Sequence, residues 1–286
     1  MSASEWRLGE WRRGRFPEEG EGTQLDLFAA GDLRPASPSP ASARRESISP
    51  RDLEDAGLIE AIARAGAADG PALAMEAGRR GLAIAVPALE DLCRRFAGFG
   101  LERPIPEQVA ALEGLAMIGG GAAARTVARI IAKGAVQGPA LKVAVAAAAR
   151  LRSELAAEVV LGLLRHPDPD VRAGACRCVR MWPQAIAALL ELREDPEGDV
   201  SLAADCALGR LGRREALSAL AARLRKAPSP EIIEAVAPIA DDDCIVLLAR
   251  IVRTVPDLAE LALEALEAID HPRAAQLLQR LAGHRD

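Results

Sequence analysis

His166-Pro-Asp-Pro-Asp-Val-Arg-Ala-Gly-Ala175 is the stretch of this chain that decides its fold. Pro and Asp open it, Val171 follows as the first apolar residue, and small residues come next. Asp is favoured as a helix N-cap and Pro in the first helical turn, so a helix is predicted to begin here. Small side chains let one helix approach another closely. The stretch therefore predicts a short turn followed by a helix that packs tightly against its neighbours.

The same order of turn and apolar residue recurs along the chain, for example in Gly198-Asp-Val-Ser-Leu-Ala-Ala-Asp-Cys-Ala-Leu-Gly-Arg-Leu-Gly212. Aligning the first apolar residue after each such turn gives Leu73, Val109, Leu141, Val171, Val200, Ile232 and Leu258, spaced 26 to 36 residues apart. This is the period of a two-helix repeat, in which each pair buries its apolar face against the next pair. We therefore expect an all-α fold, an α-solenoid of about seven two-helix repeats over residues 49–286. Ser49 as N-cap and Pro50 in the first turn are expected to open it.

The two quoted stretches resemble HEAT repeats, in particular the short type that is shared with phycobilisome lyases. The resemblance implies a ladder of Asp and Arg side chains between successive repeats, and Asp170 and Arg172 match its positions. Asp199 is followed by Ser201 instead of Arg, and Lys142, Ile233 and Ala259 occupy the Arg position in other repeats, so the ladder is degenerate. The resemblance covers roughly residues 50–286 and indicates the fold but hardly any function.

The amino-acid composition agrees with a helical protein and limits the partners and the cell compartment that we expect for it. Half of the 286 residues are hydrophobic, yet only 2% are aromatic and Tyr is missing, whereas strands favour aromatic and β-branched residues. The formal net charge of −5 gives the whole chain no electrostatic reason to bind nucleic acid. The start of the chain lacks a secretory pattern and no apolar run is long enough to span a membrane, so a bacterial-style cytoplasmic protein is expected.

Five cysteines, an odd number, indicate free thiols in a reducing compartment. Cys176 and Cys178 are two residues apart, which turns them by about 200° on a helix and prevents both from binding one metal ion. They are expected to be buried as small hydrophobic residues.

Residues 1–48 are predicted to be a disordered tail, because Pro, Ser and Ala dominate the linker 35–44 and cannot form a core. Within this tail lies Gln24-Leu25-Asp26-Leu27-Phe28. Leu27 and Phe28 can enter one apolar pocket and Leu25 a shallower site, while Gln24 bonds polar groups at the rim and Asp26 faces solvent. The segment is therefore suited to act as a short docking peptide.

This pentapeptide resembles, at all five positions, the consensus motif by which bacterial polymerases and repair factors bind the DNA sliding clamp. The resemblance implies the clamp as a partner, with Leu27 and Phe28 as buried anchors and Gln24 as the hydrogen-bonding end. We expect an affinity of roughly 1 μM for so short a contact. Two alternatives stay open: the segment packs on the folded domain, or the match is accidental.

A basic surface is predicted on the concave face, which the second helix of each pair lines in HEAT-like proteins. The helices expected from Pro139 and Pro169 carry its cations, and the last two carry mainly glutamates. The candidate residues for binding a second protein partner, or DNA indirectly, are Lys142, Arg150, Arg152, Arg172, Arg177 and Arg180. The alternative is that they form ordinary solvated faces and salt bridges between repeats.

We expect no catalytic residue, metal ion or cofactor. His166 and His271 each precede a proline at a helix boundary, Gly119-Gly-Gly121 suits a tight turn, and Asp241 suits a helix cap. The sequence thus favours a non-enzymatic scaffold that docks on the clamp in DNA replication or repair. The alternatives are a DNA-binding or DNA-glycosylase-like HEAT protein, a chromophore lyase, or a scaffold unrelated to the clamp.

Overall fold

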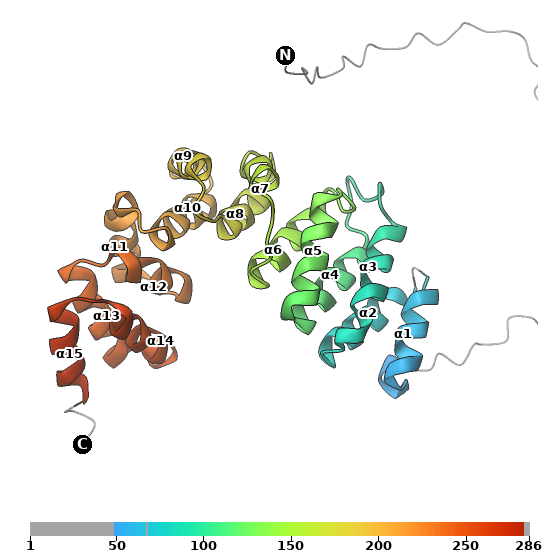
Figure 1. Ribbon diagram of the computed structural model, residues 1–286, viewed down its shortest axis with the longest axis horizontal. Coiled ribbons are helices and arrows are strands. Elements are labelled where there is room, and N and C mark those ends of the chain that lie inside the picture. Colours follow the sequence, from blue (N-terminus) through green and yellow to red (C-terminus); the bar gives the residue numbers. More distant parts are fainter. Residues whose placement is uncertain (1–48, 67, 283–286) are drawn as a thin grey trace, which may run out of the picture. The chain divides into compact units, whose positions relative to one another are not determined.

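A computed structural model describes residues 49–66 and 68–282, and the candidate docking peptide lies outside them. Over these described residues the chain is entirely helical, with fifteen α-helices and four short 3-10 helices (Figure 1). The α-helices are α1 (Asp55–Arg64), α2 (Gly70–Arg79), α3 (Val86–Arg95), α4 (Pro106–Ile118), α5 (Gly120–Ala132), α6 (Pro139–Arg150), α7 (Ala157–Leu164), α8 (Pro169–Cys178), α9 (Pro183–Leu192), α10 (Gly198–Arg210), α11 (Leu217–Lys226), α12 (Pro230–Val236), α13 (Asp242–Thr254), α14 (Pro256–Ala268) and α15 (Pro272–Ala282). The 3-10 helices are η1 (Pro50–Asp52), η2 (Ala83–Ala85), η3 (Arg214–Ala216) and η4 (Ala237–Ile239).

The helices α1 to α14 form seven successive pairs arranged in two rows. In the even row, each of α2, α4, α6, α8, α10, α12 and α14 packs against the next, while the odd-numbered helices form the second row. Helix α15 packs on both α13 and α14 and closes the end of the stack. One hydrophobic core runs through the whole domain, from Leu58 in α1 to Ala274 in α15. The predicted solenoid of about seven two-helix repeats is confirmed.

Most helices of the even row begin at the residues that the sequence predicted as helix starts. Helices α4, α6, α8, α12 and α14 all start with proline, whose missing N–H has no intrahelical partner to lose at this position. Side chains cap the first turns of α8 and α12. Asp168 accepts the backbone N–H of Asp170 at 2.8 Å, and Ser229 accepts that of Ile232 at 3.4 Å. At the start of the domain the outcome differs from the prediction, because Ser49 and Pro50 open the short η1 and the first α-helix begins only at Asp55.

Helices of the even row approach one another through glycine. A Cβ atom placed on Gly114 of α4 would stand 2.7 Å from the carbonyl oxygen of Ala74 in α2, and one on Gly78 of α2 would stand 2.7 Å from the Cα of Gly114. Real Cβ atoms do not come this close to backbone atoms. These two glycines therefore set how near α2 and α4 can lie.

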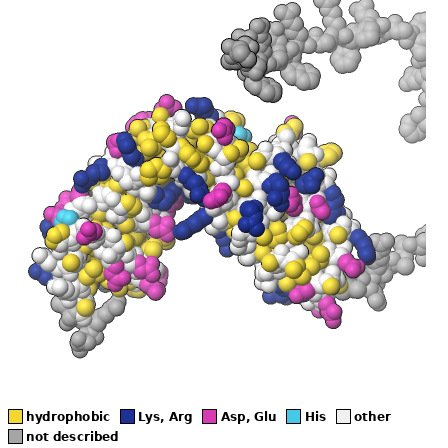
Figure 2. Space-filling model, in the orientation of Figure 1, with side chains coloured by type: hydrophobic (Ala, Val, Ile, Leu, Met, Phe, Trp, Pro, Cys, Tyr) yellow, Lys and Arg dark blue, Asp and Glu magenta, His cyan; other side chains and the backbone are white. Residues whose placement is uncertain are grey.

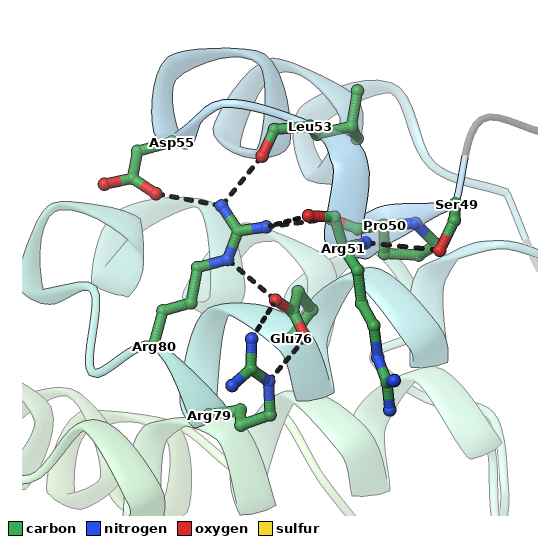
Figure 3. Close-up of polar contacts among 8 residues, drawn as sticks. All are labelled: Ser49, Pro50, Arg51, Leu53, Asp55, Glu76, Arg79 and Arg80. Carbon is green, nitrogen blue, oxygen red and sulfur yellow. Dashed lines mark hydrogen bonds and ion pairs between the residues drawn. The ribbon is translucent and has the colours of Figure 1, made fainter.

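The beginning of the domain is held by the guanidinium group of Arg80, which lies at the end of α2 and uses every N–H group it has (Figure 3). Its Nε donates to Glu76 at 2.7 Å, and its two terminal nitrogens donate to the side chain of Asp55 and to the carbonyl oxygens of Pro50, Arg51 and Leu53 at 2.8 to 3.1 Å. Hydrogen bonds from Arg79 and Arg80 lower the pKa of the buried Glu76 from 4.5 to about 2. The point at which residues 1–48 join the repeats is thereby fixed to α2.

No helix within the described residues is both long enough and apolar enough to cross a lipid bilayer.

Candidate partner-binding groove

The even row carries a groove with an apolar floor, which we call the methionine groove. It has a volume of about 670 Å³ and is lined by residues of α2, α4, α6, α8 and α10. Its apolar lining includes Met75, Met117, Val143 and small residues of α6 and α8. Charged side chains of both signs also line it, namely Glu113, Lys142, Arg150, Asp170, Arg177 and Asp199. Apolar surface ringed by mixed charge is the arrangement found in protein-binding grooves.

A second hollow, of about 750 Å³, adjoins the methionine groove and shares Ala146, Arg150 and Arg177 with it. We call it the arginine groove, since Arg150, Arg152, Arg177, Arg180 and Arg210 all line it, together with Glu231 and Glu234 of α12. Figure 2 shows Lys and Arg side chains gathered in the hollowed middle of this face. The two hollows therefore form one continuous recessed surface with a basic part.

Five of the six predicted basic residues line this surface, and Arg172 does not. Its guanidinium group makes a two-pronged contact with Asp195, at 2.9 and 3.0 Å, and also donates to the carbonyl oxygens of His166 and Pro167. The contact lowers the pKa of Asp195. Lys142 also bridges neighbouring repeats, since its Nζ lies 3.1 Å from Asp170. The expected ladder between repeats thus exists here, with Lys142–Asp170 and Arg172–Asp195 as successive rungs.

Other cations of the arginine groove are partly neutralised by neighbouring carboxylates. Arg177 makes two hydrogen bonds with Glu231 of α12, at 2.9 and 3.1 Å, and Arg210 lies 3.8 Å from the same carboxylate. Arg180 lies 3.3 Å from Glu154. The pairs with Glu231 join α8 and α10 to α12, and the Arg180 pair joins the segment after α8 to the loop after α6, so these pairs stabilise the groove as well as lining it.

Arg150 and Arg152 are exposed, and within the described part of the chain no carboxylate lies within 4.0 Å of either. Both also line a hollow of about 920 Å³ beside the α4–α5 turn, where Arg125 joins them. Arg125 lies over this turn, since its Nη1 is 3.2 Å from where a Cβ of Gly121 would stand. Sequence reasoning missed Arg125, because α5 belongs to the odd row, whereas the basic residues were sought only on the even row.

A family model for HEAT repeats matches residues 156–240, which span the pairs α7/α8, α9/α10 and α11/α12. The described chain is a HEAT-like helical repeat domain. No curated protein matches the chain. The match includes the Asp170 and Arg172 rungs and most of the arginine groove. HEAT repeats in general mediate protein interactions, which suggests a general scaffold role for this HEAT-like domain.

The cysteines of the HEAT-like domain lie in its core. All five are buried, and burial raises the pKa of the Cys178 thiol to about 11 and those of the other four to about 12. Thiolates, which bind metals and act as nucleophiles, are therefore scarce at neutral pH. The expectation that Cys176 and Cys178 pack as small hydrophobic residues is confirmed.

The remaining candidate residues stabilise turns of the HEAT-like domain. The Nδ1 atoms of His166 and His271 each accept a backbone N–H two residues ahead, at 3.1 and 3.2 Å. Asp241 caps α13 by accepting the backbone N–H of Cys244 at 2.9 Å. Gly119 and Gly120 join α4 to α5 with positive φ angles of 72° and 75°. Each of these residues thus has a local structural role.

Proposed function

We propose that this protein is a non-enzymatic adaptor of bacterial DNA replication or repair. In this proposal it works in the cytoplasm, where Gln24-Leu25-Asp26-Leu27-Phe28 docks on the DNA sliding clamp and the HEAT-like domain holds a second protein. The observation that carries the proposal is the agreement of this pentapeptide with the clamp-binding consensus at all five positions.

The spacing between the docking peptide and the HEAT-like domain supports an adaptor. About 20 residues separate Phe28 from Ser49, and a flexible chain of that length reaches roughly 25 Å. Arg80 fixes the other end of this connection by binding the backbone of Pro50, Arg51 and Leu53. A partner in the methionine groove would then be held near the clamp, at an effective concentration of about 1 mM.

The methionine groove supports a protein as the second partner. Met75 is 38% exposed, and methionine adapts its shape to different apolar surfaces. Glu113, Arg150 and Asp199 are exposed at the groove. An amphipathic helix could bury its apolar face on the floor and place charged side chains at this rim.

Calorimetric titration of the intact chain with a bacterial sliding clamp tests the proposal. We expect a dissociation constant of about 1 μM for the natural sequence and a loss of at least about 100-fold when Leu27 and Phe28 are both changed to alanine. Asp26→Ala is the matched control, because the side chain of Asp26 is expected to face solvent and its removal should leave the affinity unchanged. Equal binding by the natural chain and the double variant would refute clamp docking through this peptide.

A further inference from the structure

Four helices of the HEAT-like domain end with the same backbone structure. After α2, α5, α6 and α10, one residue with positive φ donates its N–H to the carbonyl three residues earlier, and the next residue donates to the carbonyl five residues earlier. This is the Schellman arrangement, in which the residue with positive φ is usually glycine. It is Gly81 after α2, Gly134 after α5 and Gly212 after α10, but Arg152 after α6.

Arg152 is the exception among these ends, with a φ of 51°. An L-residue in the left-handed region is strained because its Cβ approaches the following carbonyl oxygen. At Gly81, Gly134 and Gly212 an added Cβ would meet nothing within 4 Å, so these three helix ends have room for a side chain as well. Packing space therefore does not explain why only the fourth end carries Arg. When a residue other than glycine keeps a strained backbone at a position suited to glycine, its side chain is a candidate for a function.

The side chain of Arg152 lines two hollows at once. In the arginine groove it is accompanied by Arg150, Arg177, Arg180 and Arg210, and beside the α4–α5 turn by Arg125 and Arg150. Among the described residues, Arg125, Arg150 and Arg152 have no carboxylate within 4.0 Å. Of the residues that the structure describes, Glu154 is the one acidic residue that lines the hollow beside the turn, and it pairs with Arg180. Three guanidinium groups without a carboxylate partner in the described part of the chain thus line one recess.

We propose that this arginine cluster, Arg125, Arg150 and Arg152, binds the phosphate backbone of double-stranded DNA without reading its sequence. The planar guanidinium group matches the geometry of phosphate oxygens. Together the two hollows are lined by six arginines, which are Arg125, Arg150, Arg152, Arg177, Arg180 and Arg210, against three glutamates, Glu154, Glu231 and Glu234. The linings of these hollows thus carry an excess of positive charge, whereas the chain as a whole has a net charge of −5.

The residues around the cluster favour duplex over single-stranded DNA. Over residues 49–66 and 68–282, no aromatic side chain lines either hollow, and proteins that bind single strands stack the unpaired bases on such side chains. The cluster belongs to the pair α5/α6, and the other three arginines of the two hollows lie in α8, just after α8 and in α10. The six together present charge along several repeats, as a regular phosphate backbone requires. The inference concerns these helices alone and does not depend on clamp docking.

Fluorescence anisotropy with a labelled duplex of about 20 base pairs and the full chain, without any clamp, tests this inference. Three phosphate contacts predict that the logarithm of the binding constant falls with the logarithm of salt concentration with a slope of about −3 between 50 and 200 mM. Arg152→Gly should reduce the slope by about 1 and weaken binding about 10-fold at 50 mM salt. The same variant should melt about 2 °C higher, because glycine relieves the strained backbone.

Two matched variants separate a ligand-binding role of Arg152 from a structural one. Arg225→Ala removes an exposed charge from α11 in the odd row and should leave DNA binding unchanged. Gly212→Arg creates the same strained helix end after α10 and should lower the melting temperature by about as much as Arg152→Gly raises it. A variant that gains stability while losing DNA affinity is the result we expect.

Any of four results would overturn the inference. The first is that the natural chain does not bind the duplex, and the second is that Arg152→Gly binds it as well as the natural chain does. The third is that Arg152→Gly melts at a lower temperature than the natural chain, which would make the role of Arg152 structural. The fourth is that polyglutamate displaces the labelled duplex more effectively than unlabelled duplex does, when the two competitors are compared at equal concentrations of negative charge. This result would identify an acidic peptide as the ligand.

Discussion

Replacing Gly114 by alanine tests the close contact between α2 and α4. Gly114 lies in the middle of α4 and faces α2, where its missing side chain lets the carbonyl oxygen of Ala74 approach. The added Cβ would stand 2.7 Å from that oxygen, against at least 3.4 Å in an ordinary contact. The two helices must therefore separate by about 0.7 Å, the difference between these distances, or α4 must distort.

The size of the effect follows from two opposing terms. Overpacking a core costs about 1–3 kcal/mol, and we take about 3 because a backbone carbonyl cannot rotate away as a side chain can. Alanine is favoured over glycine inside a helix by about 1 kcal/mol. The net expectation is a free energy of unfolding lower by about 2 kcal/mol, or a melting temperature lower by about 4–8 °C for a domain of this size.

Denaturant unfolding followed by helical circular dichroism measures this difference, and Gly162→Ala is the matched control. Gly162 lies inside α7, is exposed, and an added Cβ there would meet nothing within 4 Å. The same substitution should therefore stabilise the protein at this site by about 0.5–1 kcal/mol. If Gly114→Ala is as stable as the natural chain while Gly162→Ala behaves as expected, α2 and α4 do not pack as described.

Three further predictions concern the contacts of Arg80, the carboxylate of Glu76 and the cysteines. Arg80→Ala should lower the melting temperature clearly more than Arg79→Ala does, because Arg80 binds five acceptors whereas the Arg79 side chain is 62% exposed and bonds only Glu76; equal effects would contradict this role of Arg80. Since the pKa of Glu76 falls from 4.5 to about 2 on folding, its contribution is complete above pH 4.5 and is lost as the pH falls towards 2. Melting temperatures measured across this range should therefore fall less steeply for Glu76→Gln than for the natural chain, and parallel curves would show that Glu76 is not the group responsible. A thiol reagent such as Ellman's should label no cysteine in the folded protein and all five after denaturation, so rapid labelling without denaturant would contradict the burial of these thiols.

The starts of the even-row helices could be predicted from the sequence because their signals are local. Proline and a short polar residue at a turn act within a few residues, and each of Pro106, Pro139, Pro169, Pro230 and Pro256 begins a helix. At Ser49 and Pro50 the same local signal gives only a 3-10 turn. There the backbone carbonyls of η1 bind Arg80, some 30 residues away, and no local pattern contains that contact.

The basic surface was predicted less completely, because it depends on contacts between distant residues. Arg172 and Lys142 look alike as charges in the sequence, but Arg172 binds a loop carboxylate whereas Lys142 remains at the groove. Arg125 was missed since its helix belongs to the other row. The left-handed conformation of Arg152 carries no sequence signal, because glycine is the residue that normally marks such a helix end.

The most direct test of the adaptor proposal is one set of titrations that measures sliding-clamp binding for three chains. They are the natural chain, the Leu27→Ala, Phe28→Ala variant and Arg152→Gly. The account predicts that the natural chain and Arg152→Gly bind the clamp equally, at about 1 μM, and that the tail variant does not bind. Clamp binding that survives in the tail variant, or that is absent from the natural chain, would contradict it.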